Sequence, residues 1–235
     1  MEINLTNNSD LIIEKDKKDV GLANLTERLA KGHEYVEIGG VKWATMNVGA
    51  TGVTDEGMYF QWGDTEGYIR SQVGVDKTFD SSNYKFLPRG FGGAPDYGMS
   101  KYKTTDRYKN LTAEDDAVTA NWGGAWRLPT SDEFVALSGT TYTEWTNNYK
   151  GTKKKGLIVT DRKDETKELF FPAASKAQNS SVYDIGTLCY YLSSTVYPTF
   201  VADACVLYFD NNGGYNWVSQ SYRFHGYVVR GVLDV

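Results

Sequence analysis

Short strand-like runs separated by glycine turns dominate the chain from Tyr35 onward and constrain its fold most strongly. Residues 35–38 and 41–46 alternate between apolar and polar side chains around Gly39-Gly40, which is typical of a β-hairpin. Residues 58–62 form another candidate strand. Residues 156–160 and 168–172 bracket a charged turn and predict a second hairpin. The chain is therefore expected to build its core mainly from short strands.

Two helix starts interrupt this pattern in the middle of the chain. Thr112 is a candidate N-cap for a helix over residues 113–120, whose first turn is acidic. The capping box Thr130-Ser-Asp-Glu133 predicts a second helix, with Gly139 as its terminator. Two helices among short strands predict an α+β fold with a small antiparallel sheet.

The first 35 residues are expected to form an extension separate from a domain over residues 36–235. Leu22, Leu25 and Leu29 recur at helical spacing between a possible cap, Asp19, and a stop, Gly32. This pattern predicts a short amphipathic helix that either packs on the domain or serves assembly or attachment, in which case a homo-oligomer is expected. Residues 69–109 lack periodicity and are expected to form a long loop region.

Charge and hydropathy patterning exclude several classes of partner. The formal net charge of -5 and the lack of a basic cluster argue against nucleic-acid binding. The chain contains no run of eighteen apolar residues, so no membrane-spanning segment is expected. The N-terminus lacks the basic and apolar regions of a signal peptide, so we expect either a protein not secreted by that route or a chain that begins after processing. Cys189 and Cys205 are expected to be buried free thiols, with a single disulfide as the alternative.

The last fifty residues have the composition of a recognition surface. Eleven of them are aromatic and only five are charged. Part of this segment reads as buried strands, but the rest interleaves Tyr, Trp, Ser, Asn and Gly in turn-rich sequence. Rigid aromatic side chains supply contact area, and small polar side chains supply adaptable hydrogen bonds. Trp217 lies between polar turn residues, so we expect it to be an exposed anchor for a ligand.

The sequence contains weaker signals for catalysis than for ligand binding. With His33 and His225 as the only histidines, a histidine triad or a multi-histidine metal site has few candidates. Asp64 and Glu66 are candidates for an acid pair or a calcium site, but support of a loop is the favoured interpretation. We therefore expect no enzymatic activity, no cofactor and no metal. The other tryptophans, at positions 43, 62, 122 and 126, are expected to pack in the framework.

A series of spaced motifs resembles one protein family. These motifs are Trp43-Ala-Thr-Met-Asn-Val-Gly-Ala50, Gly57-x-Tyr59-x-x-Trp-Gly-Asp-Thr-Glu66, Asn121-Trp-Gly-Gly-Ala-Trp-Arg-Leu-Pro-Thr130, Leu169-Phe-x-Pro-Ala-Ala174, Tyr191-x-Ser-Ser-Thr195, Ala204-x-x-Leu-x-Phe209 and Arg223-x-x-Gly226-x-x-Val-Arg-x-Val232. In this order they resemble the Fibrobacter succinogenes major paralogous domain family over about residues 36 to 233. Leu192 replaces a usual Trp, and Cys205 replaces a common Tyr.

The resemblance implies a C-type lectin-like fold, related to formylglycine-generating enzymes and to variable proteins diversified by retroelements. The two cysteines do not sit in the motif of those enzymes, so their chemistry is not implied. A binding surface in the C-terminal third is implied instead. We expect a protein or glycan on a cell surface as the partner, and a bacterial surface or a phage virion as the location. Arg223 and Arg230 are expected to brace the framework.

The expected ligand-binding residues all come from that C-terminal third. They are Tyr190, Leu192, Val196, Tyr197, Thr199, Asp210, Tyr215, Asn216, Trp217, Ser219, Tyr222 and His225. The alternative is a carbohydrate-binding or adhesion module whose surface is fixed rather than diversified.

Overall fold

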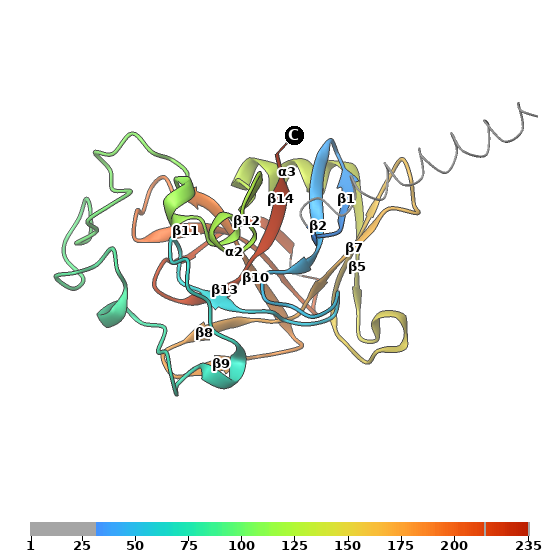
Figure 1. Ribbon diagram of the computed structural model, residues 1–235, viewed down its shortest axis with the longest axis horizontal. Coiled ribbons are helices and arrows are strands. Elements are labelled where there is room, and N and C mark those ends of the chain that lie inside the picture. The colour runs from blue at the N-terminus through green and yellow to red at the C-terminus, as the bar shows by residue number, and fades with distance from the viewer. Residues whose placement is uncertain (1–31, 214, 235) are drawn as a thin grey trace, which may run out of the picture.

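The computed structural model describes residues 32–213 and 215–234, which form three sheets and two short α-helices (Figure 1). The described part is thus mainly β with a minor α component, as the sequence predicts at this level. The helix expected around Leu22, Leu25 and Leu29 lies outside the described residues.

The first sheet has the strand order β1-β2-β14-β4 and is antiparallel. Its strands are β1 (Tyr35–Ile38), β2 (Val41–Asn47), β14 (Arg230–Leu233) and β4 (Trp126–Arg127). Gly39 and Gly40 both have positive φ, at 63° and 80°, which the two-residue turn between β1 and β2 requires. The predicted N-terminal hairpin is confirmed, and β14 brings the C-terminal end of the chain beside it.

The second sheet is the largest and has the order β12-β11-β10-β13-β8-β9, with β3 also paired to β13. The strands are β3 (Tyr59–Phe60), β8 (Lys176–Gln178), β9 (Ser181–Tyr183), β10 (Leu188–Val196), β11 (Asp203–Asp210), β12 (Tyr215–Tyr222) and β13 (Gly226–Val228). The third sheet joins β5 (Thr141–Thr146), β6 (Gly156–Asp161) and β7 (Glu168–Pro172). Antiparallel pairing of β6 with β7 confirms the second predicted hairpin.

The helix α3 (Ser131–Thr140) begins as the sequence predicts. The Thr130 hydroxyl accepts from the Glu133 amide at 3.2 Å, and Glu133 accepts in return from the Thr130 amide at 2.7 Å. The helix does not end at Gly139. It continues to Thr140 because the hydroxyls of Thr140 and Thr141 donate to the last carbonyls of the helix, which removes the need for a glycine cap.

The other predicted helix is divided in two. Residues Ala113–Asp115 form the 3-10 turn η4, and α2 (Ala117–Trp122) starts only after it. Asp116 caps α2, because its carboxylate accepts from the amides of Val118 and Thr119 at 2.9 and 3.0 Å. Thr112 is therefore not the N-cap of a continuous helix. The sequence showed several acidic residues but did not show which one caps.

Residues 69–109 contain the 3-10 turns η2 (Arg70–Gln72) and η3 (Ser81–Asn83) but no strand, and η5 (Tyr149–Gly151) lies in a later loop. The predicted long loop region is confirmed, and it forms the loops at the left of Figure 1. In contrast, the strand predicted over residues 58–62 is reduced to the two residues of β3.

The large sheet has apolar cores on both faces. Neighbouring residues along β10 and β11 belong to different cores: Leu192 and Val206 to the first, Tyr191 and Leu207 to the second. Trp62 and Trp126 are fully buried in the first core, and Trp43 is fully buried in the second. Trp122 is half-buried and packs against the first core. The framework role predicted for these tryptophans is confirmed.

Candidate functional site

An open part of the large sheet carries a row of polar and aromatic side chains, here called the tyrosine row, made of Tyr190, Tyr208 and Asn216. Tyr208 lies directly opposite Tyr190 on β10 and opposite Asn216 on β12. The ring centroids of the two tyrosines are 5.0 Å apart. Cross-strand neighbours of this kind restrict each other's rotamers, so the row presents a defined surface.

Two charged groups flank the tyrosine row. The Tyr208 hydroxyl donates to Asp210 at 2.8 Å, and the Lys176 ammonium group lies 4.9 Å from the centroid of the Tyr190 ring. Burial raises the pKa of Tyr208 to about 12, and burial lowers the pKa of Lys176 while the negative charge of Asp203 acts in the opposite direction. Both tyrosines are neutral near neutral pH, so the row offers hydroxyl groups beside the amino group of Lys176.

A second group of rings, here called the aromatic cluster, comprises Phe91, Tyr97, Phe200, Tyr222 and Phe224. Tyr222 stacks on Phe224 at 4.7 Å, and Phe91 meets Tyr222 edge-on at 6.1 Å. Tyr97 lies 4.2 Å from Phe200. Phe91 and Tyr222 remain 47% and 40% exposed, so two rings of the cluster face solvent.

Three of the expected ligand-binding residues are buried. Leu192 is only 1% exposed, within the first core, so it does not belong to a surface site. His225 is 6% exposed and lies against the rings of Tyr222 and Phe224. Burial, with a smaller effect of the nearby Lys176 charge, lowers the pKa of His225 to about 4. The expected surface contact at His225 is therefore wrong in the described conformation, because its neighbours cover the imidazole.

Val196, the third buried residue, is joined by Tyr197 at a different place. Both line a cavity of about 540 Å³ between the loop at residues 103–110, the start of α3 and the turn after β10. Cys205 and Val218 also line this cavity. Val196 is 9% exposed and packs in the first core, so Tyr197 is the more accessible of the two predicted residues.

Trp217 lies on the opposite face of the sheet from the tyrosine row because it follows Asn216, and neighbouring residues of a strand alternate between faces. Val206 pairs with Ser219 and Tyr208 pairs with Asn216, so three residues of β11 match four of β12 and the pair contains a bulge. Trp217 packs against the second core and is half-buried. The expectation of an exposed anchor at Trp217 is therefore wrong. Ser219 stays on the face of the tyrosine row.

The remaining expected residues divide in the same way. Asp210 and Asn216 lie at the tyrosine row, and Tyr222 belongs to the aromatic cluster. Thr199 is exposed beside Phe200. Tyr215 is part of β12, but its side chain is not among those that the structure describes. The predicted set thus spreads over two surfaces, a cavity and the core rather than forming one patch.

Several residues of these surfaces were missed by sequence reasoning. Tyr208 is absent from the expected set, and it shares the face of Tyr190 because the two residues pair across β10 and β11. Lys176 reaches the row only through pairing of β8 with β13, which no local signal reveals. Phe91 and Tyr97 lie in the glycine-rich loop, where aromatic residues without periodicity were the one available signal.

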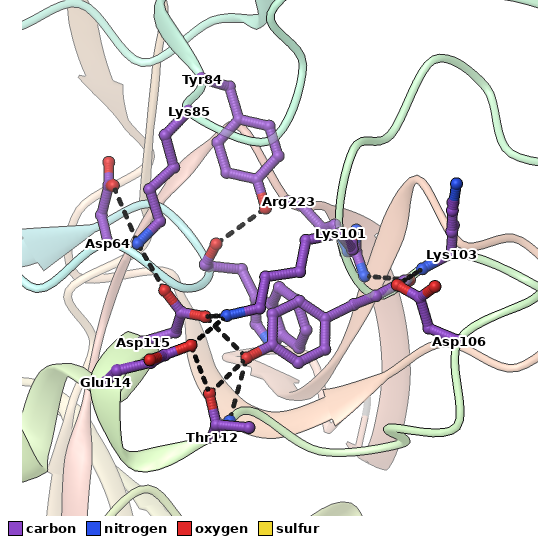
Figure 2. A network of polar contacts seen from close by, with 12 residues as sticks. Asp64, Tyr84, Lys85, Lys101, Lys103, Asp106, Thr112, Glu114, Asp115 and Arg223 are labelled. Carbon is purple, nitrogen blue, oxygen red and sulfur yellow. Dashed lines mark hydrogen bonds and ion pairs between the residues drawn. The ribbon is translucent and has the colours of Figure 1, made fainter.

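Carboxylates near Asp64 are engaged by lysines (Figure 2). Asp64 lies 3.8 Å from Lys77 and 4.0 Å from Lys85, and Lys85 also pairs with Asp115 at 2.8 Å. Burial raises the pKa of Asp64, which the two lysines oppose. Within residues 32–213 and 215–234, no group of three His, Cys, Asp or Glu side chains is placed to hold a metal ion. This geometry matches the predicted supporting role of the Asp64 loop.

Both cysteines are free and buried, which confirms the favoured interpretation and excludes a disulfide between them. Burial raises the pKa of Cys205 to about 11 and raises the pKa of Cys189 well above its ordinary value. Both thiols are therefore protonated near neutral pH and lack the thiolate character of a nucleophile.

Among residues 32–213 and 215–234, no helix has the length and apolar character that a membrane span requires.

Comparisons with known proteins give no further guide to the function. No family model, no curated protein and no solved structure matches this chain.

Proposed function

We propose that this chain is a non-enzymatic ligand-binding protein that attaches to a protein or glycan on a cell surface through its C-terminal third. The tyrosine row is the observation that carries the proposal. Its side chains come from three adjacent strands and lie on one open part of the sheet. Tyr190 and Tyr208 supply apolar ring area and hydroxyl groups, and Asn216 adds an exposed amide.

The physical case rests on preorganisation. Tyr190 is held by its partner Tyr208 on one side and by the Lys176 ammonium group over its ring. A tyrosine has few rotatable bonds, so ordering it on binding costs little conformational entropy. Groups already held in place contribute more of their contact energy to affinity. Such a surface supports binding better than it supports turnover.

The proposal of binding without catalysis is also supported by the titratable groups. His225 is enclosed by aromatic rings and Asp64 is paired with lysines. Neither is placed as a free base beside a nucleophile. An enzyme related to the formylglycine-generating enzymes is the less favoured alternative.

We further propose that the fold is C-type lectin-like and that retroelement mutagenesis diversifies the C-terminal surface. The motif order described above supports this proposal, as does the placement of Asp210, Asn216 and Tyr190 on a single face. A bacterial cell surface, an extracellular location or a phage virion would suit such a protein. A fixed-specificity carbohydrate-binding module is the alternative, favoured by a tyrosine pair on which a sugar ring would stack.

Binding measurements with a matched pair of tyrosine variants test the function. Fluorescently labelled protein is applied to a glycan array and to intact bacterial cells. Tyr190→Ala should weaken binding at least about tenfold, as expected for loss of an interface anchor. Tyr142→Ala is the control, because Tyr142 is 56% exposed but lies on β5 in a separate sheet. Equal binding by both variants, or no binding by the wild type to any cell or glycan, would contradict the proposal.

Sequencing tests the diversification separately. The coding region for residues 186–235 and its flanking DNA are read in many clones of the source population. Substitutions confined to adenine positions of a nearby repeat would support a diversified surface. A uniform sequence without a repeat would favour the fixed-specificity alternative.

A further inference from the structure

Residues 86–100 form a loop, here called the aromatic loop, whose two ends meet at one carboxylate. Lys85, which precedes the loop, pairs with one oxygen of Asp115 at 2.8 Å, and Lys101, which follows it, pairs with the other oxygen (Figure 2). The Tyr102 hydroxyl also donates to Asp115, at 2.7 Å. Asp115 is 6% exposed, whereas the side chains of Lys85 and Lys101 are 36% and 32% exposed.

The ends of the loop are also closed by the backbone. The Ser100 amide donates to the Phe86 carbonyl at 2.8 Å. Within the loop, the amides of Gly92 and Tyr97 donate to the carbonyls of Tyr97 and Gly93, both at 2.9 Å. The loop is therefore a compact unit whose ends are closed by these backbone bonds and by the contacts of Lys85 and Lys101 with Asp115.

The rings of this loop meet the C-terminal third of the chain. Phe91 contacts both Tyr222 and Phe224, and Tyr97 contacts Phe200. Phe200, Tyr222 and Phe224 contact one another without the loop, and the loop adds the rings of Phe91 and Tyr97 to them. Position of the loop decides whether the exposed rings form one continuous surface.

The chemistry of the cluster indicates what it would contact. Three of its five rings are phenylalanines, which offer no hydrogen-bond donor or acceptor. A sugar brings many hydroxyl groups that would lose water without gaining partners there. Apolar and aromatic side chains of a protein would instead bury the exposed faces of Phe91 and Tyr222, as anchor residues do at protein interfaces.

We propose that the aromatic cluster is a preformed docking surface for a protein partner and that Asp115 is the positioning residue that holds its Phe91 side. This inference rests on the proposed binding function and commits it to a protein rather than a glycan at this surface. Asp115 itself touches no partner. It acts through Lys85 and Lys101, which fix both ends of the aromatic loop.

Cell binding after selective surface removal tests the partner class. Labelled protein is applied to intact bacterial cells that are untreated, treated with a protease, or treated with mild periodate, which destroys glycans. We expect binding to be lost after protease and kept after periodate. Loss after periodate alone would overturn the inference and leave the proposed binding function standing. Failure to bind any untreated cell or arrayed glycan would instead overturn the proposed function.

Variants test the surface itself. Phe91→Ser should weaken binding to untreated cells at least about tenfold, whereas Val75→Ser should not. Val75 is the matched control because it is an exposed apolar loop residue, at 80% exposure, outside the cluster. Equal affinity of the Phe91→Ser variant and the wild type would overturn the assignment of this surface.

Asp115→Asn tests the positioning role. Hydrogen exchange should become faster at the amides of residues 86–100 but stay unchanged in β10 and β11. Cell binding should fall in the wild-type background but change little further when Phe91 is already Ser, because both changes disable the same surface. Additive losses, or unchanged exchange in the loop, would show that Asp115 does not position it.

Discussion

Two buried arginines act as braces between segments that are distant in sequence. Arg230 is fully buried and donates to Asn47 and to the carbonyls of Ala44, Thr45 and Phe170, at 2.9 to 3.1 Å. Its guanidinium therefore joins the first sheet to the third. A planar group with five donors suits this task, which lysine could not perform in the same way. The bracing role expected of Arg230 is confirmed, with carbonyls rather than carboxylates as the partners.

Asp203 provides a prediction at the residue scale. Burial raises the pKa of Asp203 to about 6, while the charges of Arg223 and Lys176 act to lower it. A carboxyl group that is harder to ionise when folded reduces stability as pH rises from about 4 through 6. His225, whose pKa is lowered to about 4, contributes a dependence of opposite sign, so Asp203→Asn should remove only the Asp203 contribution and raise the free energy of unfolding at pH 7 by on the order of 1–3 kcal/mol.

Chemical denaturation at pH 4 and pH 7 measures this effect. Asp184→Asn is the control, since Asp184 is exposed. At pH 4 the Asp203 variant and the wild type should be nearly equal in stability. A variant that keeps the pH slope of the wild type would show that Asp203 is not its source.

At the scale of single elements, β12 shows how one irregularity assigns side chains to faces. Its bulge opposite Val206 and Tyr208 reverses the alternation partway along the strand. Asn216 and Ser219 therefore share a face, although an unbroken strand would place them on opposite faces. Trp217, which follows Asn216, lies on the other face and packs against the second core.

Two tryptophan substitutions test this assignment. Trp126→Ala should destabilise the protein by about 3–5 kcal/mol, since this side chain is fully buried in the first core. Trp217→Ala should cost about 1–3 kcal/mol, because Trp217 is half-buried against the second core. Urea denaturation gives both values. An unchanged stability in the Trp217 variant would restore that residue as a candidate ligand contact.

At the scale of the whole molecule, the long loops are joined to the large sheet through Arg223. This side chain is fully buried, lies 4.3 Å from the centroid of the Trp62 ring, and donates to the carbonyls of Lys101 and Tyr102 at 3.1 and 2.7 Å. The loops therefore pack as part of the domain. Loop segments of this kind usually open more readily than core strands, so such an anchor determines their local stability.

Arg223→Met should loosen the loops before it unfolds the sheets. Each carbonyl that loses its donor costs about 1–3 kcal/mol, enough to speed local opening at least about tenfold. Limited trypsin digestion should then cut sooner after Lys103, Arg107 and Lys109. Arg162→Met is the control, because Arg162 is exposed and donates to the Thr141 carbonyl of β5, which belongs to the third sheet and not to the long loops. Equal digestion of both variants would contradict the anchoring role.

Local sequence signals determined those parts of the protein whose structure depends on neighbouring residues. The Gly39-Gly40 hairpin, the capping box at Thr130, the long loops and the buried tryptophans follow from turn geometry, capping and composition, which act over a few residues. The free, buried state of Cys189 and Cys205 was likewise predicted from the sequence. These features established a mainly β framework with two helices before any contact between distant segments was considered.

Only the tertiary structure decided which side chains share a surface. Pairing of β12 with β11 places Trp217 against the second core, pairing of β8 with β13 brings Lys176 to Tyr190, and the contacts of Asp115 close the loop whose Phe91 meets Tyr222. Each depends on strand register or on charges far apart in the chain. A shift of one residue in register moves a side chain to the other face of a sheet, and the amino-acid composition of the strand does not reveal that shift.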